Sequence, residues 1–395
     1  MPPPQTQTLQ TPILLLDGGL GTTLADSHAC TFNTDTPLWS SHLLLTDPNT
    51  LLAVQTAFVD AGADILLSAT YQASYEGFEG TVVRDGKGVG EREAGGFMRS
   101  AVGIARRAFD SDSSLSSRRD GGGDEKEGGK RKEKGTVALS LGAYGATMVP
   151  SQEYTGKYDE ERMSVSGLTA WHLKRLRAFT GTGSGTSTST GSGSGSGVLD
   201  AEERGRCWAD VDLVAFETLP LLREITAVRA VMGGIEAEGV ERRAFWVSCV
   251  FPGEGMGLPD GSAVRDVVIA MLGAGEGLSV PMGVGINCTK VGKLEALVLE
   301  FEREIEVVVG RGEAEWPALV VYPDGTNGEV YDTVTKEWVK SETGNNSGVS
   351  WDETVFGIVD RARKRGFWKS IIVGGCCKTT PDDISKLRKR IDQSS

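Results

Sequence analysis

Short apolar runs recur along this chain, separated by longer stretches compatible with amphipathic helices. Several runs are rich in β-branched side chains, and most are followed at once by polar or glycine-rich residues. Buried parallel strands have this pattern, and the spacing leaves room for a crossover helix between most pairs. The runs are Ile13–Leu16, Ile65–Leu67, Val137–Leu141, Leu213–Phe216, Phe245–Val250, Met282–Ile286, Ala318–Tyr322 and Ile371–Val373.

Eight strand–helix units in one chain suggest a (β/α)8 barrel of the TIM type. A doubly wound open sheet would have strands of the same composition. The barrel is preferred because chemically useful polar side chains follow nearly every run, and a barrel brings those positions together on one face. We therefore expect a single α/β domain that spans residues 11–390.

Segments of low complexity interrupt this pattern at residues 111–134 and 181–197. The first is rich in Ser, Gly and charged residues, and the second is almost purely Gly, Ser and Thr. Neither can bury enough apolar surface to offset its ordering entropy, so we expect disordered insertions within the barrel, away from the catalytic face. A shorter polar segment, Glu342–Ser350, follows the seventh run and could lie nearer the site.

Composition narrows the possible partners. The formal net charge is −13, which argues against a nucleic-acid or anionic-membrane partner, because both require clustered Lys and Arg. No run approaches the ~18 apolar residues of a membrane span, and the first ten residues lack the pattern of a secretory signal. Six cysteines in 395 residues do not suggest a disulfide scaffold. A cytoplasmic protein with reduced thiols is the simplest interpretation.

Three cysteines lie where predicted strands end. Cys288 follows the sixth run, and Cys376 and Cys377 follow the eighth run after Gly374 and Gly375. In a barrel these strand ends are close on one face, so three thiolates could bind a zinc ion and leave its fourth tetrahedral position open, as catalytic zinc sites do. The glycines would let the backbone crowd the metal. The alternative is that each cysteine is a small buried hydrophobic residue, as we expect for Cys30, Cys207 and Cys249.

Two carboxylates also lie at predicted strand ends. Asp17 follows the first run and Glu217 follows the fourth. Together they could hold a substrate ammonium through charge-assisted hydrogen bonds. Each could equally pair with a neighbouring Arg or cap a helix. The histidines form no cluster with metal-ligand spacing, and we expect His172 to cap or pack a helix.

Taken together, the motifs resemble those of the homocysteine S-methyltransferase family. The Gly-Gly-Cys-Cys element with an upstream Asn-Cys is highly specific, whereas each other piece alone is weak. In chain order the pieces are Leu16–Gly19, Ala69–Ser74, Gly142–Ala146, Glu153–Gly156, Phe216–Thr218, Gly285–Cys288, Tyr322–Asp324, Gly328–Glu329, Gly374–Cys377 and Thr379–Pro381.

The resemblance implies a (β/α)8 barrel with zinc bound by Cys288, Cys376 and Cys377. It also implies that Asp17 and Glu217 hold the amino group of homocysteine. The expected reaction moves a methyl group from a sulfonium donor, S-methylmethionine or S-adenosylmethionine, to the zinc-activated thiolate of homocysteine and forms methionine. The expected range of the barrel leaves no room for a folate or cobalamin module.

The chain departs from the family pattern in loops of the expected active face. Ala143 stands where the family usually has proline, Ala69 stands where it usually has asparagine, and Gly325–Asn327 are additional. These changes put the donor preference in doubt more than the zinc chemistry. Two alternatives remain open, a non-catalytic zinc- or thiol-binding barrel and a betaine-dependent methyltransferase. A zinc hydrolase would need a general base beside the metal, and none is evident.

Overall fold

The structure is a computed structural model of the 395-residue chain. It describes residues 11–33, 36–82, 88–110, 135–181, 196–326, 329–332, 337–340 and 349–394. The predicted insertion at 111–134 lies outside these residues, as does most of the one at 181–197 and most of the Glu342–Ser350 segment. Helix α7 (Ser196–Asp210) begins within the last two residues of the second predicted insertion.

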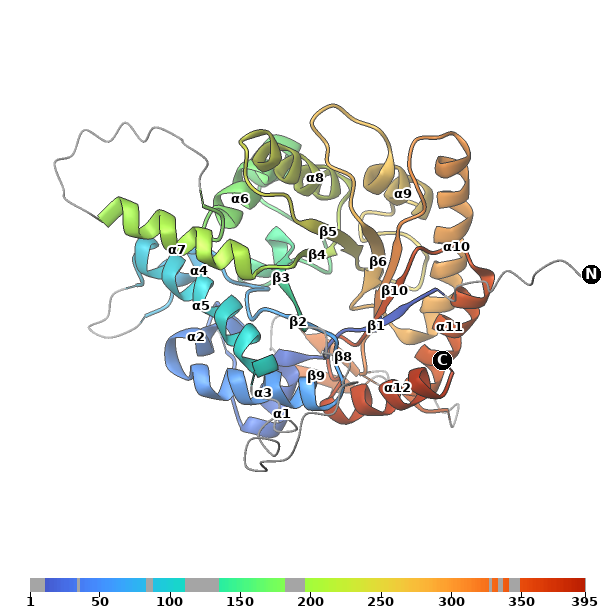
Figure 1. The fold of residues 1–395 in the computed structure, drawn as a ribbon, viewed down its shortest axis with the longest axis horizontal. Helices are drawn as coiled ribbons and strands as arrows, with labels where there is room; N and C mark the ends of the chain where they lie inside the picture. The colour runs from blue at the N-terminus through green and yellow to red at the C-terminus, as the bar shows by residue number, and fades with distance from the viewer. Residues whose placement is uncertain are drawn as a thin grey trace, which may run out of the picture.

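Eight parallel strands form a closed barrel, which confirms the predicted fold class (Figure 1). The hydrogen-bonded order is β1-β10-β7-β6-β5-β4-β3-β2, and a parallel bridge between Leu16 and Ile65 joins the two ends of this sheet. The strands are β1 (Ile13–Leu15), β2 (Ile65–Leu67), β3 (Thr136–Gly142), β4 (Leu213–Leu219), β5 (Ala244–Cys249), β6 (Gly283–Asn287), β7 (Ala318–Tyr322) and β10 (Ile371–Val373).

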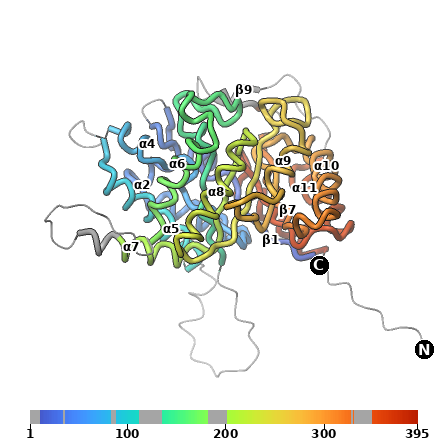
Figure 2. Tube along the Cα trace, turned by 90° about the horizontal axis from the view of Figure 1, so that it is seen from above, coloured from blue at the N-terminus to red at the C-terminus, as the bar shows by residue number. Residues whose placement is uncertain are grey.

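Helices surround the barrel, and Figure 2 shows the same arrangement from a second direction. The crossovers place apolar helix faces against the outside of the sheet, as right-handed βαβ connections require. The helices of eight or more residues are α1 (Leu20–His28), α3 (Pro48–Asp60), α5 (Glu91–Asp110), α6 (Val165–Leu176), α7, α8 (Leu222–Ala237), α9 (Val264–Leu272), α10 (Val291–Gly310), α11 (Trp351–Arg365) and α12 (Pro381–Gln393). The shorter ones are η1 (Trp39–His42), α2 (Leu43–Thr46), α4 (Tyr75–Glu79), η4 (Tyr144–Thr147) and η5 (Glu160–Met163).

One pair of strands was not expected from the sequence. β8 (Glu329–Asp332) and β9 (Glu337–Lys340) form a separate antiparallel hairpin after β7. The pattern of long apolar runs could not reveal it, because each strand is short and its sequence mixes charged with apolar residues. This hairpin follows directly on the additional residues Gly325–Asn327.

Two hydrophobic cores stabilise the fold. The larger one lies between the strands and the surrounding helices. The smaller one is formed mainly by strand residues and includes Trp246 and Tyr322, each at most 1% exposed. Large side chains in this smaller core make the barrel a packed structure and not a pore.

The described surface gives no sign of a membrane segment. None of the helices in this part of the chain combines the length and apolar character needed to cross a bilayer.

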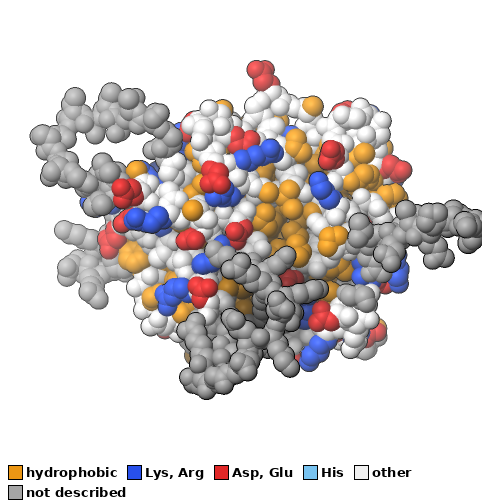
Figure 3. Space-filling view, viewed as in Figure 1, with side chains coloured by type: hydrophobic (Ala, Val, Ile, Leu, Met, Phe, Trp, Pro, Cys, Tyr) orange, Lys and Arg blue, Asp and Glu red, His pale blue; other side chains and the backbone are white. Residues whose placement is uncertain are grey.

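On the face seen in Figure 3, basic and acidic side chains are interspersed. That face therefore has no large area of a single charge sign that would attract a polyanion.

Gly285 in β6 marks a close approach of two strands, and its substitution tests the barrel geometry. A Cβ at this position would lie 1.8 Å from the carbonyl oxygen of Val320 in β7. We expect Gly285→Ala to lower the free energy of unfolding by about 2 to 3 kcal/mol, because backbone cannot yield as a side chain does. Urea denaturation followed by circular dichroism measures this.

Gly292→Ala is the matched control, because the exposed Gly292 lies in α10 with nothing within 4 Å of the added Cβ. Alanine favours a helix over glycine by ~1 kcal/mol, so the control should be neutral or stabilising. Equal unfolding energies for the two variants would show that β6 and β7 are not packed as described.

Candidate metal and substrate site

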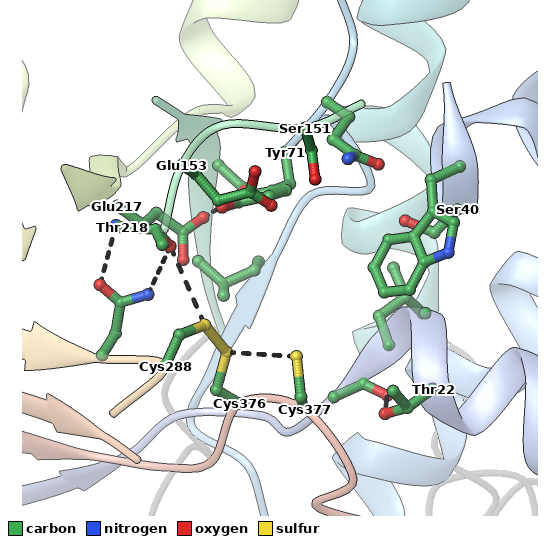
Figure 4. A pocket seen from close by; sticks show the side chains of 18 of the residues that line it. Thr22, Ser40, Tyr71, Ser151, Glu153, Glu217, Thr218, Cys288, Cys376 and Cys377 are labelled. Carbon is green, nitrogen blue, oxygen red and sulfur yellow. Dashed lines mark hydrogen bonds between the residues drawn. A yellow bond between two sulfur atoms is a disulfide. The ribbon is translucent and has the colours of Figure 1, made fainter. Parts of the chain in front are cut away.

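The three predicted cysteines come together at one end of the barrel (Figure 4). Cys288 directly follows β6, and Cys376 and Cys377 lie in the loop after β10. Their sulfur atoms all lie within 4.8 Å of one another. In this structure Cys288 and Cys376 form a disulfide, and the sulfur of Cys377 lies 4.0 Å from that of Cys376.

These cysteines fit a metal ion once the disulfide is reduced. Sulfurs bound tetrahedrally at ~2.3 Å from one zinc ion lie roughly 3.8 Å apart. The sulfurs of Cys376 and Cys377 already have nearly this spacing, at 4.0 Å, whereas those of Cys288 and Cys376 are bonded and would have to separate. Burial, together with the carboxylates of Asp324 and Glu153, raises the pKa of the Cys377 thiol to about 12. Without a metal this thiol stays protonated at neutral pH, so metal binding must displace its proton.

The two glycines before the cysteine pair have a different role from the one predicted. A Cβ on Gly374 would lie 2.6 Å from the carbonyl oxygen of Asp17, and one on Gly375 would lie 2.4 Å from the Cβ of Thr379. The amide of Gly375 donates to the carbonyl oxygen of Asp17 at 3.0 Å. The glycines therefore let the cysteine loop pack against the end of β1 and against its own continuation.

The loop after β10 ends at α12, and the start of this helix is well capped. Thr380 caps the helix through a reciprocal capping box with Asp383, and Pro381 occupies the first turn. Such a cap satisfies backbone N–H groups that the helix itself cannot pair. The cysteine pair is thus held between a strand and a well-fixed helix start.

Asp17 lies at the edge of the same cavity and is 2% exposed. Its Oδ2 accepts a hydrogen bond from the amide of Leu67 at 2.9 Å, and its Oδ1 is buried without a hydrogen-bond partner. Burial raises the pKa of Asp17 well above its usual range, and the nearby charge of Glu217 raises it further. The ion pair with Arg that the sequence left open is absent among the described residues.

Glu217 lies within β4, not after it, because the strand continues to Leu219 through an irregularity in its register with β5. The hydroxyl of Ser140 donates to Glu217 Oε1, and Tyr322 is also hydrogen-bonded to this carboxylate. Burial raises the pKa of Glu217 to about 7. Asp17 and Glu217 thus form a buried acidic pair beside the cysteines.

A link between Thr218 and Asn287 was not identified from the sequence. The amide of Thr218 donates to Asn287 Oδ1 at 2.8 Å, and Asn287 Nδ2 donates to Thr218 Oγ1 at 2.7 Å. Thr218 Oγ1 lies 3.9 Å from the sulfur of Cys288. The sequence did hint at a role for each residue, since Asn287 directly precedes a cysteine and Thr218 directly follows a carboxylate. That the two residues contact each other could be seen only in the folded structure.

Arg175 of α6 is a second positioning residue that the sequence did not reveal. Its buried guanidinium donates to the carbonyl oxygens of Gly142 at 2.8 Å, Thr70 at 2.6 Å and Tyr71 at 2.5 Å. Burial lowers the pKa of Arg175 to about 10, so the group remains charged at neutral pH. It joins the carboxyl ends of β2 and β3, which form one wall of the cavity.

The remaining cysteines and His172 have the structural roles expected of them, with one exception. His172 is buried in α6, where its Nε2 lies 2.9 Å from Glu224 Oε1. Cys207 and Cys249 are buried, whereas Cys30 is only partly buried because it lies in the loop after α1. None of them approaches the cysteine group.

The cavity has an unusual balance of charge. Its described lining contains three carboxylates, Asp17, Glu153 and Glu217, and no Lys, Arg or His. The rest is largely apolar or aromatic, with Trp39, Tyr71 and Tyr154 among its walls. Such a cavity is suited to cationic ligands, because three buried carboxylates line it, whereas Arg175, whose charge lowers the pKa of Glu217, is not part of the lining.

Comparison with known proteins shows which family the chain belongs to. The family model for homocysteine S-methyltransferase matches residues 14–391. Homocysteine S-methyltransferase 2 of Arabidopsis thaliana is 30% identical, with 95% of this chain and 92% of that protein covered. Selenocysteine Se-methyltransferase of Brassica oleracea var. italica is 29% identical over 95% of this chain and 88% of its own length.

Among solved structures, the metallated form of the homocysteine methyltransferase MmuM from Escherichia coli superposes with a TM-score of 0.62. It is 25% identical, and the match covers 96% of both chains. Family model, relatives and structure agree over nearly the whole chain. The chain therefore belongs to the homocysteine S-methyltransferase family.

Proposed function

We propose that this chain transfers a methyl group from a sulfonium donor to the thiolate of homocysteine, with zinc held by Cys288, Cys376 and Cys377. The observation that carries the proposal is the meeting of three cysteine sulfurs and a buried pair of carboxylates in one cavity. Both features are needed for a substrate with a thiol at one end and an ammonium at the other.

Zinc is the metal that this donor set fits best. An all-sulfur set selects soft or borderline ions, and three protein ligands leave one tetrahedral position for a substrate sulfur. A zinc ion bound there supplies the charge that keeps a coordinating thiol deprotonated at neutral pH. A thiol needs such help because the thiolate, and not the thiol, is the nucleophile.

Asp17 and Glu217 orient homocysteine by its amino group. The unpartnered Oδ1 of Asp17 and the carboxylate of Glu217 can both accept hydrogen bonds from one ammonium. The ammonium relieves the repulsion that raises the pKa of Asp17. Two fixed anchors hold the thiol near the metal, and such positioning contributes to the rate.

The methyl transfer itself needs no general acid or base. A lone pair of the homocysteine thiolate forms the new S–CH3 bond, and the pair of the breaking C–S bond stays on the donor sulfur as a neutral thioether. An anion and a cation neutralise each other in this step, so a water-poor cavity favours the transition state over solvated reactants. The apolar and aromatic walls around Trp39 and Tyr71 provide that environment.

Two other functions fit the same site less well. A non-catalytic thiol-binding barrel does not require two buried carboxylates beside its cysteines, yet both Asp17 and Glu217 are buried here. A betaine-dependent enzyme would use the same metal and acceptor, so only the donor separates it from the proposal. We also infer a cytoplasmic location, because a reducing compartment would keep Cys288 and Cys376 as thiols.

We predict one zinc ion per reduced chain, bound by sulfur alone. X-ray absorption should show three cysteine sulfurs and no imidazole nitrogen. Cys377→Ala should lose most of the metal, whereas Cys30→Ser should keep it, because Cys30 lies away from the group. Nitrogen ligation, or full zinc content in Cys377→Ala, would disprove this site.

We predict that Glu217→Gln raises the homocysteine KM about 10- to 100-fold at pH 8, because an amide keeps the shape but loses the charge that pairs with the ammonium. Zinc content should not change. Since the pKa of Glu217 is about 7, the wild-type carboxyl takes up a proton as the pH falls below 7, and its advantage over the variant should shrink there. A variant that unfolds or loses zinc would show that Glu217 is structural.

We predict turnover with sulfonium donors, with S-methylmethionine preferred to S-adenosylmethionine, and none with methyltetrahydrofolate. A methyl group on cationic sulfur is already activated, whereas the folate methyl requires activation that this cavity does not provide. Competition between the two sulfonium compounds, each labelled in the methyl group, measures the preference. Turnover with betaine alone would place the chain in a different branch of the family.

A further inference from the structure

Glu153 is the third carboxylate of the cavity, and homocysteine does not account for it. It lies in the loop that follows β3 and is 7% exposed. Figure 4 shows it beside Tyr71 on the far side of the cavity from the three cysteines. A third buried acidic group thus lies across the cavity from the sulfur atoms.

The carboxylate of Glu153 is poorly satisfied within the protein. Its Oε2 is buried without a hydrogen-bond partner, and Ser151 and the backbone provide the few bonds that the group has. Burial outweighs these bonds and raises the pKa of Glu153 to about 7. No described Lys, Arg or His lines the cavity to offer a counter-charge. A buried charge without a partner is costly unless a ligand supplies one.

Glu153 comes from a different part of the barrel than the acidic pair, since it follows β3 whereas Asp17 follows β1 and Glu217 lies in β4. The pKa of Asp17 responds to Glu217, yet the main influences on these two groups do not include Glu153. Glu153 acts instead on Tyr71 and on the Cys377 thiol. A cation between Glu153 and the sulfur cluster would therefore face a carboxylate on one side and the nucleophile on the other.

We propose that Glu153 binds the sulfonium centre of the methyl donor. This assignment rests on the proposed function and names the group that selects a cationic donor. The acidic pair takes the ammonium of homocysteine, and Glu153 takes the positive charge on the sulfur of the donor.

The change in charge on the donor during methyl transfer determines which kinetic constant Glu153 can affect. The donor carries a full positive charge in the ground state, loses part of it in the transition state and leaves as a neutral thioether. An interaction that weakens toward the transition state lowers KM and does not raise kcat. Glu153 therefore acts in donor binding and in discrimination against the neutral product, and is not a group that accelerates the transfer.

The test compares two ligands of one shape and different charge. Calorimetry with the zinc-loaded full chain at pH 8, without homocysteine, measures binding of S-methylmethionine and of its carbon isostere, in which CH replaces the sulfonium sulfur. Glu153→Gln should weaken S-methylmethionine binding about 10- to 100-fold, because the variant loses a charge–charge attraction in a cavity of low dielectric constant. Binding of the isostere should change less than about threefold.

Matched variants complete the design. Glu160→Gln removes an exposed carboxylate from the same loop region and should leave both ligands unaffected. Glu153→Asp keeps the charge on a shorter side chain and should retain part of the preference for the cation. In turnover assays Glu153→Gln should raise the donor KM without lowering kcat.

Several results would overturn the proposal. Equal losses for both ligands would assign Glu153 to the donor ammonium, and a lower kcat at unchanged donor affinity would assign it to the chemical step. A loss of homocysteine affinity would place it with the acidic pair. Failure of the proposed function has a different signature, namely a wild-type protein that turns over no sulfonium donor. Binding of the sulfonium is measured independently of that result.

Discussion

The pairing of the first strand with the last is the constraint on which the site depends. Residues 13–15 of β1 lie in register with 371–373 of β10, and the bridge from Leu16 to Ile65 completes the ring. This closure brings Asp17 beside the cysteine loop, although more than 350 residues separate them in the chain. Glycines at 374 and 375 let the two backbones touch. The proposed metal ligands and the proposed substrate anchor Asp17 therefore lie where the first and last strands meet, which is the kind of support that precise catalytic geometry requires.

The sequence was sufficient to predict the barrel, its strands and the cysteine cluster. β2, β7 and β10 have the predicted bounds, because buried parallel strands are continuous apolar runs that periodicity reveals directly. The continuation of β4 through Glu217 could not be predicted, since its last residues are polar and its register is irregular. The three carbonyl contacts of Arg175 and the link between Thr218 and Asn287 were also missed. These depend on which loops meet in space, and hydrophobic patterns carry no information on that.

The buried carboxyl groups of the cavity destabilise the fold when no cationic ligand is bound. Glu217 and Glu153 both have pKa values raised to about 7 by burial. A carboxyl with a raised pKa binds its proton more tightly in the folded state, so its contribution to stability declines as the pH rises from the unfolded pKa, ~4.3, through about 7. At neutral and higher pH the fold thus carries unfavourable electrostatic energy that cationic substrates relieve. Ligands of this kind should stabilise the protein by mass action, and they do so at the positions where the chemistry occurs.

The described lining of the cavity contains no Lys, Arg or His, and this has a consequence for the free energy with which the two substrates bind together. In the proposed reaction, homocysteine enters as a zwitterion whose ammonium offsets one charge of the acidic pair, while its thiolate brings a new negative charge to the sulfur cluster. Under the proposed function, that thiolate faces the cationic donor across the cavity and attracts it. Linkage then requires the converse, so the donor must strengthen homocysteine binding by the same factor. Under this proposal, a cavity whose described lining has carboxylates but no Lys, Arg or His makes each substrate part of the other's binding site, and favours the ternary complex over either binary one.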